Sequence, residues 1–153
     1  MSFVLHNGML LCSLCIGDEV VVFEPAFDTY PAQIQMAGGV AKYVPLRLDS
    51  DHKNWVINMS ELERAISSKT KIVLLNTPHN PTGKVLSEEE MYKIREILLK
   101  YPHVIAVCDE VYEKLIFDNN KHCRLASLPG MWERTLTVSS VGKTFSVTGW
   151  KVG

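Results

Sequence analysis

The chain has 153 residues, of which 46% are hydrophobic and 22% charged, and its formal net charge is −1. This length is sufficient for one domain with its own hydrophobic core, and the composition is typical of a globular protein. So small a net charge gives no electrostatic attraction to nucleic acid or to an anionic membrane surface. No apolar run approaches the roughly 18 residues of a membrane span. We therefore expect neither nucleic acid nor a membrane as a partner.

The four cysteines, at positions 12, 15, 108 and 123, include one C-x-x-C pair. Such a pair is compatible with redox or zinc chemistry, but Cys12 and Cys15 also share one face of an apolar helix in "MLLCSLCI". The sequence has no second C-x-x-C and no pair of histidines at ligand spacing. We therefore expect buried cysteines, no metal site, and histidines that serve as turn or surface residues. The apolar N-terminal patch is preceded by no basic region, so no secretory signal is expected. Free cysteines favour the cytoplasm, with the mitochondrion as the alternative for a full-length form.

Short apolar runs alternate with amphipathic segments along the chain, a pattern that predicts an α/β fold with a mostly parallel sheet. The expected strands are 19–25, 40–46, 71–76, 104–109 and 135–140. One helix is expected after Phe27 and ends at Gly38-Gly39. Capping boxes of Ser60 with Glu63, and of Ser87 with Glu90, predict two further helices. The polar segment 49–55 is expected to be a surface loop.

Three polar features follow the expected strands at their carboxyl ends, where ligands bind in parallel sheets. They are the "HNPTG" turn at 79–83, Asp109 and Lys143. A buried carboxylate is unfavourable unless it is paired, so Asp109 either caps the following turn or holds a cationic partner. The hydroxyl of Tyr112 is expected near the same place. Lys143 is expected in a loop of small residues, where its amine can be desolvated and brought to a carbonyl carbon.

A nucleophilic lysine, an acidic partner and a hydroxyl at strand ends together suit pyridoxal 5'-phosphate. This cofactor requires a Schiff-base lysine, an aspartate that keeps the pyridine nitrogen protonated, and hydrogen bonds to its phenolic oxygen. From these residues alone, pyridoxal 5'-phosphate is one hypothesis among several.

Four collinear segments resemble the class I/II, fold-type I aminotransferases: "GDEVVVFEPAFDTYPAQIQMAGG" (17–39), "NTPHNPTGKV" (76–85), "CDEVYEKLIF" (108–117) and "SSVGKTFSVTGWKVG" (139–153). The first is similar to the branch of kynurenine aminotransferases and cysteine-S-conjugate β-lyases. The resemblance covers nearly all of residues 17–153. It implies the three-layer, mostly parallel sheet of a large cofactor-binding domain.

The resemblance implies a role for each matching residue. Lys143 matches the lysine that forms the Schiff base and later moves the α-proton, and Asp109 matches the carboxylate on the pyridine nitrogen. Tyr112 and Asn80 match donors to the phenolic oxygen. Phe27 matches the aromatic residue that stacks on the pyridine ring; its structural alternative is an ordinary core position.

Two further positions match phosphate ligands, Ser140 and Lys151, the second of which is an arginine in many relatives. A lysine serves there as a point charge without a bidentate fork. In structural terms alone, Ser140 would cap the next turn, Lys151 would be a solvated surface lysine, and Tyr112 would cover the end of the sheet.

The function that the resemblance implies is transamination between an amino acid of the kynurenine, glutamine or aromatic type and a 2-oxo acid. The family also implies a homodimer. Against the family pattern, residues 1–153 are expected to be part of the large domain, truncated at both ends and without the small domain. A shortened sheet exposes an edge, so weak stability and aggregation are expected.

Two other hypotheses stay open. The "GKT" at 142–144 is similar to part of a nucleotide-binding loop, but that motif requires a glycine where Thr137 stands. The second is a catalytically inactive fragment, which at most binds cofactor or pairs with full-length subunits.

Overall fold

A computed structural model describes residues 14–150 of the chain. Its single sheet is built from six strands: β1 (Glu19–Glu24), β2 (Val40–Leu48), β3 (Trp55–Ile57), β4 (Thr70–Asn76), β5 (Ile105–Asp109) and β6 (Thr135–Val138). The strand order is β3-β2-β1-β4-β5-β6. All neighbouring pairs are parallel except β2 and β3, which are antiparallel. The expected α/β fold with a mostly parallel sheet is confirmed.

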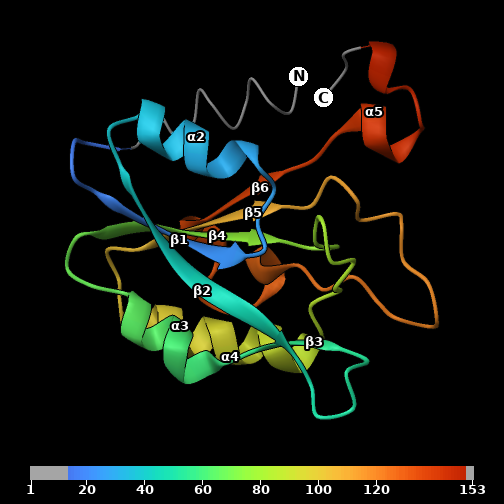
Figure 1. The fold of residues 1–153 in the computed structure, drawn as a ribbon, viewed down its shortest axis with the longest axis horizontal. Coiled ribbons are helices and arrows are strands. Elements are labelled where there is room, and N and C mark those ends of the chain that lie inside the picture. The colour runs from blue at the N-terminus through green and yellow to red at the C-terminus, as the bar shows by residue number, and fades with distance from the viewer. Residues whose placement is uncertain (1–13, 151–153) are drawn as a thin grey trace.

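The sheet is covered on both faces, which gives the three layers expected from the sequence (Figure 1). Helix α2 (Thr29–Met36) lies on one face, and α3 (Met59–Ala65) and α4 (Glu88–Leu99) lie on the other. Side chains of the central strands alternate between these layers. In β1, Val20 and Val22 pack toward α2, whereas Val21 and Phe23 pack on the opposite face. Burial on both faces explains why the central strands are continuous apolar runs.

The start and end of each helix follow local backbone chemistry. Pro31 is tolerated in the first turn of α2, where its missing N–H has no partner within the helix. The helix ends at Met36, and Gly38 follows its C-cap residue with a φ of +78°, which glycine readily adopts. The capping box of Ser87 and Glu90 that starts α4 is confirmed.

Helix α3 does not begin with the predicted capping box, so that prediction was wrong. The N-cap is Asn58, whose side chain accepts hydrogen bonds from the backbone N–H groups of Ser60 and Glu61. Ser60 and Glu63 both lie inside the helix. Asparagine is as good an N-cap as serine, and here it precedes the first apolar residue of the helix.

The predicted loop at 49–55 is also corrected at its end, because Trp55 begins the short strand β3. Leu46 pairs with Ile57 and Leu48 with Trp55, which makes β3 an antiparallel edge strand. Three residues are too few to show a strand periodicity in the sequence.

The cysteines differ from one another in environment. Cys108 is buried in β5, and Cys123 is half-buried, but Cys15 is exposed and lies outside any helix, so the prediction of a buried Cys15 was wrong. Cys12 lies outside the described residues. Within residues 14–150, no helix is long and apolar enough to cross a membrane.

Candidate functional site

The carboxyl ends of β4, β5 and β6 stand next to one another at one edge of the sheet. Asn76 pairs in register with Asp109, and Asp109 pairs with Val138. The polar turn at 79–83 and the helix α5 (Val141–Thr144) that carries Lys143 follow directly from β4 and β6. Parallel strand ends collect ligand-binding groups in this manner.

Asp109 is almost completely buried, at 5% exposure. Its Oδ2 accepts a hydrogen bond of 2.6 Å from the Tyr30 hydroxyl, and its Oδ1 accepts one of 3.2 Å from the backbone N–H of Val111. Its neighbour two residues back, Val107, packs in the layer beneath α2, so the alternation of β5 directs Asp109 to the same face. The carboxylate is therefore oriented by α2 and by its own following turn.

Tyr30 was not identified from the sequence, although it belongs to the segment "EPAFDTY". It lies on α2 at 3% exposure, and burial followed by the Asp109 carboxylate raises its pKa. Its ring meets Phe27 edge-on, with ring centroids 5.5 Å apart. Phe27 precedes the helix and Tyr30 lies in its first turn, so the two rings meet at the start of α2.

Asn76 is a second residue that sequence reasoning missed. It is buried at the end of β4, and its Nδ2 donates to the Asp109 carbonyl oxygen at 3.0 Å. Its Oδ1 accepts a hydrogen bond of 2.7 Å from the backbone N–H of Asn80. Asn76 thereby joins the β5 end to the turn that carries the half-buried Asn80.

Lys143 and Tyr112 come together beside this edge of the sheet. The Lys143 ammonium lies 5.6 Å from the centroid of the Tyr112 ring, a cation–π contact. Lys143 lies in the one-turn helix α5 rather than in the irregular loop expected from the sequence. Ser140 is buried and caps that turn, its side chain accepting from the Lys143 backbone N–H at 3.4 Å. The side chains of Lys143 and Tyr112 are half-buried, so they remain available to a ligand.

Phe27 is half-buried between β1 and α2 and touches the site through Tyr30. Its ring is thus neither a fully buried core residue nor a freely exposed one. Lys151, the second expected phosphate ligand, lies outside the described residues.

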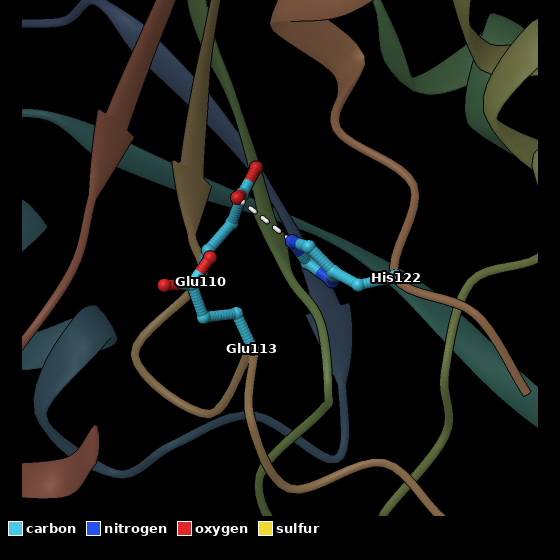
Figure 2. A group of neighbouring side chains, drawn as sticks. All are labelled: Glu110, Glu113 and His122. Carbon is cyan, nitrogen blue, oxygen red and sulfur yellow. Dashed lines mark hydrogen bonds and ion pairs between the residues drawn. The ribbon is translucent and has the colours of Figure 1, made fainter. Parts of the chain in front are cut away.

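A separate group of ionisable side chains, Glu110, Glu113 and His122, lies beside the end of β5 (Figure 2). Glu110 is fully buried, and its Oε2 lies 2.8 Å from His122 Nε2. Glu113 and Glu110 both face Arg124. One potential ligand atom from each of Glu110, Glu113 and His122 lies within 4.8 Å of the other two. The sequence predicted neither this group nor a metal site. Arg124 and His122 face the two carboxylates, whereas Glu110 Oε1 and His122 Nδ1 are buried without a hydrogen-bond partner.

His79 lies in the turn after β4, as expected, but its side chain is buried at 8% exposure. Its Nδ1 lies 2.8 Å from Thr82 Oγ1. Burial, and then the charge of Lys84, lowers the pKa of His79 from 6.5 to about 4. His79 is therefore neutral in the folded protein at neutral pH.

The burial of His79 predicts a pH-dependent stability. Between about pH 6.5 and pH 4 the unfolded chain binds a proton at His79 that the folded chain does not, so stability falls as the pH decreases. We expect the wild type to lose about 1–2 kcal/mol more than His79→Gln between pH 7.5 and pH 5, after allowance for partial solvent screening. Urea denaturation at both pH values measures the difference. Equal losses would show that His79 does not titrate in this range.

The chain matches the model of the family "Aminotransferase class I and II" over residues 5–153. It is 49% identical to the kynurenine–oxoglutarate transaminase of Dictyostelium discoideum over 149 residues, which are 90% of this chain and 34% of that protein. Among solved structures it is similar to the N-succinyldiaminopimelate aminotransferase of Mycobacterium tuberculosis (TM-score 0.94, 39% identity, 99% of this chain and 39% of that one).

A PLP-bound protein from Clostridium difficile 630, described as an aminotransferase, has the same fold (TM-score 0.85, 25% identity, 94% of this chain and 37% of that one). The fold is that of the solved aminotransferase structures. The chain belongs to the aminotransferase class I and II family. It spans about a third of the length of the Dictyostelium discoideum relative.

Proposed function

We propose that this chain forms the pyridoxal 5'-phosphate-binding part of an aminotransferase that acts on an amino acid and a 2-oxo acid. The observation that carries the proposal is the buried Asp109 carboxylate at the end of β5, with the Lys143 amine and the Tyr112 ring beside the same edge of the sheet. Membership of the aminotransferase family and a PLP-bound structural neighbour support the choice of cofactor.

The donor set fits this cofactor. A carboxylate at 5% exposure that accepts hydrogen bonds from two chain groups is a preorganised acceptor for a protonated ring nitrogen. The Lys143 amine provides a group that reacts with a carbonyl. The phenol of Tyr112, whose ring the amine contacts, provides a hydroxyl donor. A half-buried phenyl ring provides an apolar face of the kind on which an aromatic ring packs.

When bound, pyridoxal phosphate supplies an electron sink for the charge that develops at the substrate's α-carbon. In the proposed site, Asp109 would accept from the protonated pyridine nitrogen. Lys143 Nζ would hold the cofactor at its aldehyde carbon, with loss of water, and the lysine amine would move the substrate's α-proton. Tyr112 and Asn80 would donate to the phenolic oxygen, and Phe27 would cover one face of the ring.

The phosphate is assigned to the Ser140 hydroxyl and to Lys151. These two roles complete the set of residues proposed for the cofactor. Both use side chains, because α5 has only four residues and is too short to bind a phosphate through its backbone.

For the substrates, we propose an amino acid of the kynurenine, glutamine or aromatic type. The name of the Dictyostelium relative supports kynurenine, whereas the Mycobacterium tuberculosis neighbour is named for a different amino compound. We propose a homodimer as the functional assembly, as is common in this family.

The test of the function is transfer of ¹⁵N from labelled glutamine or kynurenine to a 2-oxo acid, measured by mass spectrometry. The purified chain with pyridoxal phosphate is expected to transfer label faster than the free cofactor, and Lys143→Ala is expected to abolish the excess. Lys114→Ala, at an exposed lysine next to Glu113, is the matched control and is expected to behave as wild type. A rate equal to that of the free cofactor would contradict the proposal and favour the inactive-fragment hypothesis.

A further inference from the structure

The Tyr30–Asp109 hydrogen bond links helix α2 to the strand-end site. The hydroxyl donates to Oδ2 at 2.6 Å, and both side chains are almost completely buried. The residues are 79 positions apart in the chain, so the contact forms only when α2 packs on the sheet. We propose that Tyr30 is a positioning residue, which fixes the Asp109 carboxylate in the orientation that a protonated pyridine nitrogen requires. The inference rests on the proposed function.

The geometry of the carboxylate supports this role. Val111 N–H binds Oδ1 from the strand's own turn, and Tyr30 binds Oδ2 from the opposite layer. Two donors on different oxygens restrict rotation about the carboxyl bond in a way that one donor does not. A hydrogen bond from a neutral donor also stabilises the charged form of a buried carboxylate.

Tyr30 is suited to donate rather than to exchange protons. Burial and the neighbouring Asp109 charge raise its pKa, so its hydroxyl keeps its proton at neutral and moderately alkaline pH. Its ring is held in place by Phe27, which meets it at an interplanar angle of 81°, and by Ile34 in the same apolar cluster. The donor is therefore rigid, as a positioning residue must be.

The direction of the effect follows from linkage. If Tyr30 aligns the carboxylate with the ring nitrogen, its hydroxyl strengthens binding of the protonated cofactor more than that of the unprotonated cofactor. Among the described residues, the ionisable groups that interact around the Asp109 carboxylate are Tyr30, Tyr112 and, through its contact with the Tyr112 ring, Lys143. Tyr30→Phe removes one hydroxyl and keeps the ring, so packing against Phe27 and Ile34 is retained.

The experiment compares wild type, Tyr30→Phe and Tyr92→Phe, the last being a control at an exposed tyrosine on α4. Each is titrated with ¹⁵N-pyridine-labelled pyridoxal phosphate, and the ¹⁵N chemical shift of the bound ring is followed against pH. For Tyr30→Phe we expect a dissociation constant about tenfold higher at neutral pH and a pyridine midpoint about one pH unit lower, since one unit corresponds to a factor of ten. Tyr92→Phe is expected to match wild type in both readings.

A purely structural role for Tyr30 would leave the ¹⁵N midpoint unchanged, and that result in a folded Tyr30→Phe chain would overturn the inference. If wild type itself binds no cofactor, the proposed function fails and the inference falls with it. A double-mutant cycle of Tyr30→Phe and Asp109→Asn in the cofactor-free chain tests the contact independently of the cofactor. Non-additive shifts of the urea midpoint are expected, and additive shifts would contradict the hydrogen bond itself.

Discussion

Replacing Glu110 with alanine is expected to lower the free energy of unfolding by about 3–5 kcal/mol, because it removes a fully buried side chain and leaves the largely buried His122 without its hydrogen-bond partner. Glu110 is fully buried, accepts from His122 Nε2 at 2.8 Å and lies 3.5 Å from Arg124 Nε. The substitution also leaves a cavity between the sheet and the segment that carries His122 (Figure 2).

The matched control is Glu89→Ala, which removes an exposed carboxylate that pairs with Lys93 one helical turn away. Such exposed pairs contribute about 0.5 kcal/mol or less. Urea denaturation of both variants at pH 7.5 measures the difference. If Glu110→Ala were no more destabilising than Glu89→Ala, the Glu110 cluster would not be a stabilising element of the fold.

Asp109→Ala is expected to weaken the binding of pyridoxal phosphate by about 10- to 150-fold, the equivalent of a charged hydrogen bond of about 1.5–3 kcal/mol. The reason is that Asp109 is the proposed acceptor for the pyridine nitrogen. Its carboxylate is buried at the end of β5 and accepts a hydrogen bond from Tyr30. Binding is followed by the change in cofactor absorbance on titration.

Asp51→Ala, in the exposed loop before β3, is the control for Asp109→Ala and is expected to leave the dissociation constant unchanged. Circular dichroism establishes that each variant is folded before titration. Equal dissociation constants for the two variants would remove Asp109 from the proposed cofactor site. Asp109→Asn keeps the size of the side chain and isolates the contribution of the charge.

Much of the fold follows from the sequence because the central strands are buried on both faces. Continuous apolar runs such as 71–76 and 104–109 have few alternatives in a chain that also contains amphipathic helices. The capping box at Ser87 could be recognised because its two residues, Ser87 and Glu90, lie within one turn of the helix. The error at α3 arose where Asn58 and Ser60 were both suitable N-caps and only tertiary packing decides between them.

The candidate site could be predicted only in its local parts. Asp109 and Lys143 were predicted because each directly follows an apolar strand, and parallel strands bring such positions to one edge. Tyr30 was missed because its partner lies 79 residues away, on a different layer. Glu110 was missed because adjacent residues at a strand end point to opposite faces, and His122 follows in an irregular segment without periodicity.

The central claim is that Lys143 is the lysine that bonds pyridoxal phosphate in this chain. The most direct test is to incubate the purified chain with the cofactor, reduce it with borohydride, and map the modified lysine by peptide mass spectrometry. The account predicts one major label, on Lys143, which is lost in Lys143→Ala and retained in Lys114→Ala. Label spread over exposed lysines such as Lys114 and Lys53, unchanged in Lys143→Ala, would contradict it.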